Sequence, residues 1–326
     1  MRNYSNYKKS MTLIGVLMII FGFIVGGIWF YENKIYSQTI EESAYTSKTI
    51  TRNGVNYFPR QDITVILAMG IDELGPVQSS GYYRNNGESD AIFLLVLDQT
   101  AEKYSVLCLN RDTMVEMPVL GLGGKNAGTF FGQLALSHTY GEGLQDSCEN
   151  TRDTVSNLLG GITIDHYVAL NMDAIAVIND AVGGVTVNVT DDFSDIDSAI
   201  TMGEYTLKGQ QALTFVQTRK DLGNQLNISR MDRHEEYLKG FMEAFSTKLD
   251  SDNLFAIGLY DDVSSYMVTD CSATVISGLM ERCSDYTLEK VISPEGENIL
   301  AEYYEFYVDE EKLDQIIVET FYAEKK

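Results

Sequence analysis

The stretch SDAIFLLVLD, residues 89–98, places seven consecutive apolar residues between Asp90 and Asp98. Such a continuous apolar run predicts a strand that is covered on both faces, as in layered α/β proteins. Two similar runs lie on either side of it, DITVILAMGID at 62–72 and YSVLCLNRD at 104–112. All three runs meet charged residues at an end. The sequence therefore predicts a buried sheet with polar chemistry along one edge.

Segments with strand and helix character alternate through the rest of the chain, which favours an α/β layered domain. We expect helices at 132–143, 147–161, 172–184 and 229–245, strands at 166–171 and 185–190, and a short helix running into a strand at 207–220, the strand occupying 214–218. The last part of the chain, residues 251–326, adds one expected helix at 272–283 and a strand–helix ending. We interpret it as a C-terminal extension packed on the domain formed by residues 61–250.

The N-terminal segment MTLIGVLMIIFGFIVGGIWF, residues 11–30, contains no charged residue. Twenty helical residues rise about 30 Å, which matches the hydrocarbon thickness of a bilayer. Basic residues precede the segment and acidic residues follow it, so residues 1–10 are expected in the cytoplasm and the rest of the chain outside. The alternative is a cleaved secretory signal, but no A-x-A site follows. We therefore expect a single-pass anchor at 11–31 in the cell membrane, followed by a stalk at 32–60 that leads into an extracytoplasmic domain.

Composition limits the partners that this domain can have. The chain has a formal net charge of -23, from 24 basic and 47 acidic residues. A surface this acidic repels the phosphate backbone, so binding to nucleic acid is not expected. The four cysteines form no CxxC pair, which argues against a zinc site, and we expect all four to be free.

Acidic and basic residues stand at the ends of the expected strands and helices. If the first two strands are antiparallel neighbours, the loop between them brings Asp72 and Asp90 to one edge of the sheet. Two carboxylates there can share a hard cation such as Mg²⁺, which also binds phosphate oxygens. Arginines that follow or begin nearby elements would bind phosphate oxygens bidentately, and they are Arg111, Arg219, Arg230 and Arg233. Together these groups are typical of phosphoryl transfer.

Plainer explanations exist for the same residues. Each aspartate is also a common turn residue, and Arg230 or Arg233 can belong to a solvated helix face. Arg233 lies one turn further along its helix than Arg230, and it can instead face a carboxylate, in which case its loss costs stability more than rate.

Six segments follow one another in the order and spacing of the LytR-CpsA-Psr family of bacterial cell-wall enzymes. They are LAMGID, SDAIFLLVLD, LNRDT, AVGGVTVNV, LKGQQALTFVQTRK and SRMDRHEEYL, and they cover about residues 62–245. This resemblance implies an α/β/α sandwich with a central mixed sheet, preceded by one transmembrane helix. It also implies transfer of a glycopolymer, such as teichoic acid or capsule, from a polyprenyl pyrophosphate carrier to peptidoglycan, with an apolar pocket for the lipid.

The resemblance also implies roles for individual residues. Asp72 and Asp90 match metal-binding acids that hold Mg²⁺, with Mn²⁺ as an alternative. Residues Arg111, Arg219 and Arg230 match arginines that hold the pyrophosphate. Asp112 falls on a further motif position, where it either orients Arg111 or accepts the proton of the attacking sugar hydroxyl; Arg233 falls on another, as a substrate-binding residue.

Two positions depart from the family pattern. Glu88 stands where the family usually has an arginine, and Gln217 stands where it tends to have the first arginine of an Arg-x-Arg pair. Arg84 and Lys220 are the nearby basic residues that could supply the missing substrate contacts.

Two other functions remain open from the sequence. A polyprenyl pyrophosphate hydrolase would use the same site and differ only in its acceptor. A non-catalytic surface or regulatory protein is the third possibility, although a cytoplasmic tail of ten residues leaves no room for a DNA-binding motif.

Overall fold

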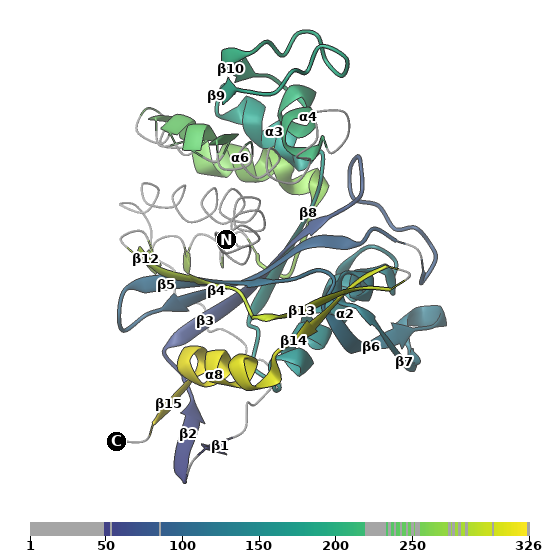
Figure 1. The fold of residues 1–326 in the computed structure, drawn as a ribbon, viewed down its shortest axis with the longest axis vertical. Helices are drawn as coiled ribbons and strands as arrows, with labels where there is room; N and C mark the ends of the chain where they lie inside the picture. Colours follow the sequence, from purple (N-terminus) through teal and green to yellow (C-terminus); the bar gives the residue numbers. More distant parts are fainter. Residues whose placement is uncertain are drawn as a thin grey trace.

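In the computed structural model, the chain forms a mixed α/β fold (Figure 1). The structure describes residues 49–52, 54–84, 86–218, 233, 236–237, 239–241, 243–245, 247–248, 251, 255–272, 275, 278–279, 282–283, 286–301 and 303–324. The anchor expected at 11–31 lies outside these residues, as do Arg219, Lys220 and Arg230. Within the described ranges, no helix is long and apolar enough to cross a lipid bilayer.

A six-stranded mixed sheet forms the centre of the fold, in the order β11-β8-β3-β4-β5-β12. The bounds of its strands are β3 Ile63–Ile71, β4 Ser89–Asp98, β5 Lys103–Leu109, β8 His166–Asn171, β11 Met267–Thr269 and β12 Thr287–Ile292. Pairing is parallel for β3–β8 and β5–β12 and antiparallel for the other neighbours. The three predicted buried strands are thus confirmed, and the first two are antiparallel neighbours.

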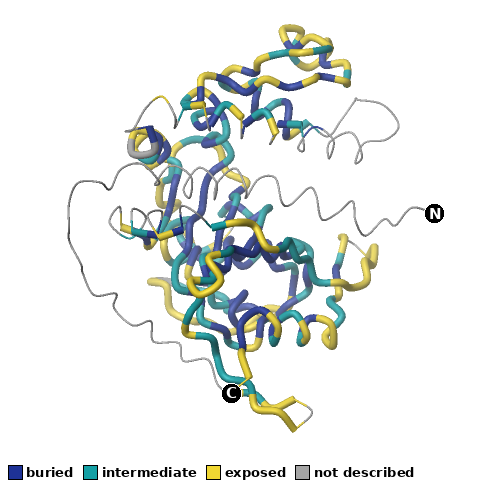
Figure 2. The backbone as a smooth tube through the Cα atoms, turned by 90° about the vertical axis from the view of Figure 1, so that its left-hand side faces the viewer, coloured by how far each residue is buried: buried dark blue, intermediate teal, exposed yellow. Residues whose placement is uncertain are grey.

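The central strands are apolar on both sides because both faces of the sheet are covered. On one face Met69 and Leu94 belong to a core that includes side chains of α2, Gln145–Leu158, and α8, Glu310–Phe321. On the other face Phe93, which is fully buried, packs in a core with Leu279 and Cys283. Alternation along each strand sends neighbouring residues to opposite cores. Figure 2 shows the buried strands running through the interior of the molecule.

A further core lies at the β8 side of the sheet, towards the top of Figure 1. It is built from α3 Ala174–Ala181, α4 Gln210–Gln217, α6 Phe255–Val263 and the hairpin of β9 Val185–Val189 and β10 Gly203–Leu207. Helix α3 ends before Gly183 and Gly184, whose φ angles of 91° and 96° suit glycine. The helices predicted at 147–161 and 172–184 are confirmed.

Two local predictions are wrong. The strand expected at 214–218 is helical, because α4 continues to Gln217 and is capped at Thr218. Its apolar residues Phe215 and Val216 are buried against the helical core, and this tertiary packing overrides the strand character of the sequence. The helix expected at 132–143 is instead the end of a strand followed by a 3₁₀ helix, η2, at Leu134–Thr139.

Residues after 251 supply both edge strands of the central sheet, β11 and β12, which the sequence did not indicate. The strands β13, β14 and β15 complete the part of this region that the structure describes. The remaining elements are β1 Ile50–Arg52, β2 Val55–Pro59, β6 Met114–Leu120, η1 Leu122–Gly124, β7 Asn126–Gln133, η3 Ser264–Tyr266, β13 Gly296–Leu300, β14 Tyr304–Val308 and β15 Tyr322–Glu324. Strand β15 pairs antiparallel with β2, which joins the C-terminal part to the strand that precedes β3.

An ion pair joins β8 to the end of β11. His166 Nδ1 lies 3.5 Å from Asp270 Oδ1, and the same carboxylate accepts a hydrogen bond of 2.9 Å from the Tyr167 amide. Hydrogen bonding to Asp270 and to Cys271 raises the pKa of His166 to about 10. His166, Asp270 and Cys271 also place three potential metal-ligand atoms within 4.8 Å of one another. They lie near the start of β3, where His166 is opposite Ile66, far along the strand from Asp72.

The His166 pair predicts a pH dependence of stability. Because the pKa of His166 is raised in the folded protein, its stabilising effect is complete below the ordinary value of 6.5 and is lost as the pH rises towards 10. The free energy of unfolding should therefore fall between pH 6.5 and 10 in the wild type, and fall less in His166→Gln. Urea unfolding at both pH values measures this difference. An equal fall in both proteins would contradict the assignment, and Asp270→Asn should behave like His166→Gln.

Candidate functional site

Polar side chains lie along the edge of the sheet where β3 and β5 end and β4 begins. Ile71 is opposite Ser89 after a break in register, and the Asp72 amide donates a hydrogen bond of 2.9 Å to the carbonyl of Glu88. Asp72 thus follows the last pair of β3 and β4, and Asp90 is the β4 residue at the break in register. Asp72 is exposed, whereas the Asp90 side chain is 17% exposed.

Arg111 lies at the tip of β5 and is surrounded by carboxylates. Its Nη1 donates to Asp90 Oδ1, and its Nη2 donates to Glu88 Oε2 over 2.9 Å. The Nε atom lies 3.5 Å from Asp112 Oδ1. Its side chain is 32% exposed, so solvent or a ligand can reach the guanidinium. An anion that takes the same N–H donors of Nη1 and Nη2 would therefore replace Asp90 and Glu88.

A compact turn fixes the backbone after β5. Asn110 accepts a hydrogen bond of 3.0 Å from the Asp112 amide at its Oδ1, and its carbonyl accepts one of 2.6 Å from the Thr113 hydroxyl. Asparagine commonly makes such local contacts in turns. The Asp112 carboxylate also accepts a hydrogen bond of 3.0 Å from Gln133 Nε2. Asp112 is therefore held beside Arg111 from two directions.

Arg233 is only 3% exposed, and protein groups occupy its guanidinium. Its Nη1 donates to Asp191, its Nε to the Phe215 carbonyl over 2.9 Å and its Nη2 to the Thr218 carbonyl over 2.6 Å. The carboxylate that the sequence offered as an alternative partner is thus Asp191. Arg233 fixes the end of α4, directly before Arg219 in the sequence.

Of the other predicted basic residues, Arg84 is among those that the structure describes. Arg84 is exposed in the loop between β3 and β4. Arg219, Lys220 and Arg230 lie outside the described residues, so their predicted roles stay predictions. The four cysteines are free and buried, as expected.

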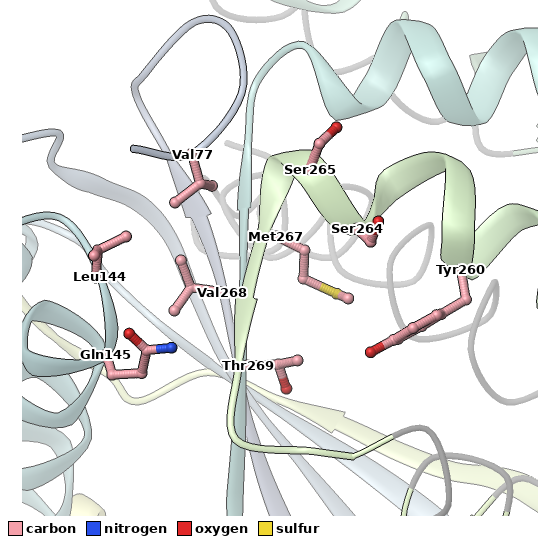
Figure 3. A pocket seen from close by; sticks show the side chains of 9 residues that line it. All are labelled: Val77, Leu144, Gln145, Tyr260, Ser264, Ser265, Met267, Val268 and Thr269. Carbon is pink, nitrogen blue, oxygen red and sulfur yellow. The ribbon is translucent and has the colours of Figure 1, made fainter. Parts of the chain in front are cut away.

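A small cavity lies at a different place from Arg111. Figure 3 shows it between the loop that carries Val77, the start of α2, and the chain from α6 into β11. Its volume is about 270 Å³, and its lining residues are Val77, Leu144, Gln145, Tyr260, Ser264, Ser265, Met267, Val268 and Thr269. This is at or below the lower end of pockets for small molecules, about 300 Å³. The lipid pocket with Arg111 at its mouth is therefore not this cavity and stays a prediction.

A family model described as the LytR_cpsA_psr family matches residues 30–321. The chain belongs to the LytR-CpsA-Psr family. The match includes both edge strands of the sheet, so the C-terminal part is included in the family's own region.

Curated relatives in this family are named as teichoic acid transferases. The polyisoprenyl-teichoic acid–peptidoglycan teichoic acid transferase TagU of Oceanobacillus iheyensis is 27% identical over 311 residues, which cover 93% of this chain and 91% of the relative. The transferase TagV of Bacillus subtilis is 26% identical over 294 residues, covering 87% of this chain and 69% of the relative.

Solved structures share the fold. The crystal structure of Bacillus subtilis TagV has a TM-score of 0.54 at 24% identity and covers 80% of this chain and 98% of that chain. A structure described as TagT bound to LI-WTA has a TM-score of 0.53 at 22% identity, covering 80% of this chain and 90% of that chain.

Two residues that contact Arg111 or Asp112 were not predicted to lie at this candidate site. Glu88 was noted only as a departure from the family pattern, and Gln133 was not singled out. Glu88 stands directly before β4, where the pairing register breaks, so strand alternation alone does not predict its contact with Arg111. Gln133 carries no signal either, because its contact with Asp112 depends on how β7 pairs with β6.

The burial of Arg233 predicts a structural role in this family member. Arg233→Ala should lower the free energy of unfolding by about 3–5 kcal/mol, because it leaves Asp191 without its buried partner. Urea unfolding measures the change. Arg152→Ala is the matched control, since Arg152 pairs with Asp153 near the surface and such pairs contribute about 1 kcal/mol or less. Equal losses in the two variants would contradict the structural role.

Proposed function

We propose that this chain is a membrane-anchored extracytoplasmic phosphotransferase that moves a glycopolymer from polyprenyl pyrophosphate to peptidoglycan. The observation that carries the proposal is Arg111, fixed at the end of a buried strand beside Asp90 and Asp112 in a chain of the LytR-CpsA-Psr family. Relatives named teichoic acid transferases support a teichoic acid-like polymer, with a capsule-like polymer as the alternative. The uncharged segment at 11–31 supports the anchor.

Arg111 would bind a phosphate of the carrier-linked pyrophosphate. A guanidinium offers two parallel N–H donors that match two phosphate oxygens, and the bound anion replaces the carboxylates in the same directions. The predicted site residues Arg219 and Arg230 would add the positive charge that an acidic surface otherwise lacks. Arg84, four residues before Glu88, and Lys220, directly after Arg219, would add to it. The charge that develops on the departing polyprenyl phosphate is stabilised by these groups.

Asp72 and Asp90 fit a Mg²⁺ ion, with Mn²⁺ as the alternative. Both are carboxylates at one strand edge, the donor type that Mg²⁺ prefers, and Asp72 is open to solvent. When bound, the ion supplies Lewis-acid stabilisation of phosphate oxygens. Asp90 contacts Arg111 in the structure, so it is placed to hold either the ion or the arginine.

The structure favours an orienting role for Asp112. Its carboxylate lies beside Arg111 Nε and accepts from Gln133, so it fixes the plane of the guanidinium. The hydroxyl of a muramic acid would attack the phosphate that carries the polymer, and polyprenyl phosphate would leave. Hydrolysis by water at the same site is the second candidate function, and comparing product formation with and without peptidoglycan oligomers separates the two. No contact among the described residues favours a non-catalytic surface role.

Removal of divalent cations should abolish transfer if Asp72 and Asp90 hold Mg²⁺. Asp90→Asn should have the same effect while the fold is kept, because Asp90 lies near the start of β4 and outside the hydrophobic cores. The measurement is transfer of a lipid-linked polymer in excess EDTA and after Mg²⁺ is restored. Asp261→Asn, on the exposed side of α6, is the control and should keep full activity. Undiminished transfer in EDTA would rule the metal assignment out.

Substitutions at Arg111 and Glu88 should act in opposite directions. A hydrogen bond to a charged group contributes about 1.5–3 kcal/mol, so Arg111→Ala should slow turnover about tenfold to a few hundredfold. Arg111→Lys should recover little, because an ammonium cannot reproduce the planar fork. Glu88→Gln should lower KM for the lipid-linked donor, because Glu88 competes with the phosphate for Nη2.

Steady-state turnover of a lipid-linked substrate by the three variants checks this pair of effects. Glu204→Gln, on an exposed face of β10, is the charge-matched control. Near-normal turnover in both Arg111 variants would show that the phosphate binds elsewhere. A raised donor KM in Glu88→Gln would show that Glu88 assists binding and does not compete with it.

A further inference from the structure

Two hairpins beside the site expose large apolar side chains. We call a group of three aromatic side chains and one leucine, Phe131, Leu300, Tyr303 and Tyr304, the aromatic rim. They are 56%, 68%, 66% and 62% exposed, respectively. Phe131 belongs to β7, and the other three belong to the tip of the β13–β14 hairpin. Exposed aromatic residues gathered beside a reaction site are a typical feature of binding surfaces.

Hydrogen bonds join this rim to Asp112. The Gln133 Nε2 atom donates both to Asp112 Oδ1, over 3.0 Å, and to the carbonyl of Tyr304, over 2.7 Å. The amide of Phe306 donates to the carbonyl of Asp112 over 2.8 Å. Phe131 shares the face of β7 that carries Gln133, because they are two residues apart. The rim therefore begins one side chain away from the proposed reaction site.

The hairpin that carries most of the rim is fixed in place by a buried residue. Phe306 of β14 is 6% exposed, and Thr113 forms a parallel bridge to it next to Asp112. Leu300 is opposite Tyr304 in the hairpin, so these two side chains share one face at the tip. Tyrosine has few rotatable bonds, so an anchored hairpin can present it at a low entropic cost.

Charge selects the kind of ligand that fits the rim. Residues 296–308 contain three glutamates and no basic residue. Glu116, which is exposed, is opposite Phe131 in the β6–β7 hairpin. An anionic polymer or an anionic lipid surface would be repelled here. A neutral sugar chain would not be repelled, and the C–H bonds on the face of a pyranose ring can pack against the negative face of an aromatic ring.

We propose that the aromatic rim binds the neutral sugar backbone of the acceptor glycan strand and guides its hydroxyl to the edge that holds Arg111. This inference rests on the proposed function, because it names where the acceptor binds. The anionic donor would occupy the arginine side of the edge, and the neutral acceptor the acidic, aromatic side. The two substrates would then approach the same phosphate from surfaces of different chemistry.

The test uses a triple variant, Phe131→Ala with Tyr303→Ala and Tyr304→Ala, in the full chain. The probe is strands of β-1,4-linked N-acetylglucosamine, which reproduce the neutral glycan backbone and carry neither peptide nor the lactyl carboxylate of peptide-free muramic acid. Stacking losses at several rings should raise the dissociation constant for these strands about 10- to 100-fold. Acceptor KM in the transfer assay should rise similarly, with hydrolysis of the lipid-linked donor in the absence of acceptor unchanged. Met202→Ala with Leu288→Ala removes exposed apolar side chains elsewhere and should change neither quantity.

Two results would overturn the inference. One is a triple variant that binds the glycan strands as tightly as the wild type. The other is a wild type that does not bind these strands, which would leave the rim without a neutral sugar ligand. A wild type that binds the strands through the rim but transfers no polymer would instead overturn the proposed function. Direct binding and transfer therefore test the two claims separately.

Discussion

The guanidinium of Arg111, held between the carboxylates of Glu88, Asp90 and Asp112, is the interaction on which the candidate site depends. Three carboxylates and one guanidinium leave a local excess of negative charge in a chain whose net charge is already -23. An anion can enter such a place only after further positive charge arrives. The proposed function therefore requires a cation and further basic residues to act together before a pyrophosphate is bound.

Segments far apart in the sequence converge on this edge. Arg233, far along the chain, fixes Thr218 at the end of α4. From the C-terminal part, β14 donates the Phe306 amide to the Asp112 carbonyl, and Gln133 joins Asp112 to Tyr304. Folding and the geometry of the candidate site are thus linked, because the contacts that fold these segments also set the positions of the polar groups.

The sequence predicted the centre of the fold well because burial on both faces leaves a direct record in it. Continuous apolar runs identified β3, β4 and β5, and the polar residues that end them located Asp72 and Asp90 at one edge. The edge strands β11 and β12 escaped prediction because β11 has only three residues, β12 has Glu289 and Lys290 within its apolar pattern, and both owe their conformation to pairing with β8 and β5. Long-range pairing also decided the contact of Gln133 with Asp112. The strand expected at 214–218 failed because its apolar residues pack into a helical core.

The most direct test of this account is a crystal structure of the protein with a polyprenyl pyrophosphate and Mg²⁺. The account predicts that Arg111 leaves Glu88 and binds phosphate oxygens through both Nη atoms, with Asp72 and Asp90 on the metal ion. Asp112 should keep its contact with Arg111 Nε. A structure in which Arg111 remains paired with Glu88 and Asp90, while the pyrophosphate binds at another place on the protein, would contradict it.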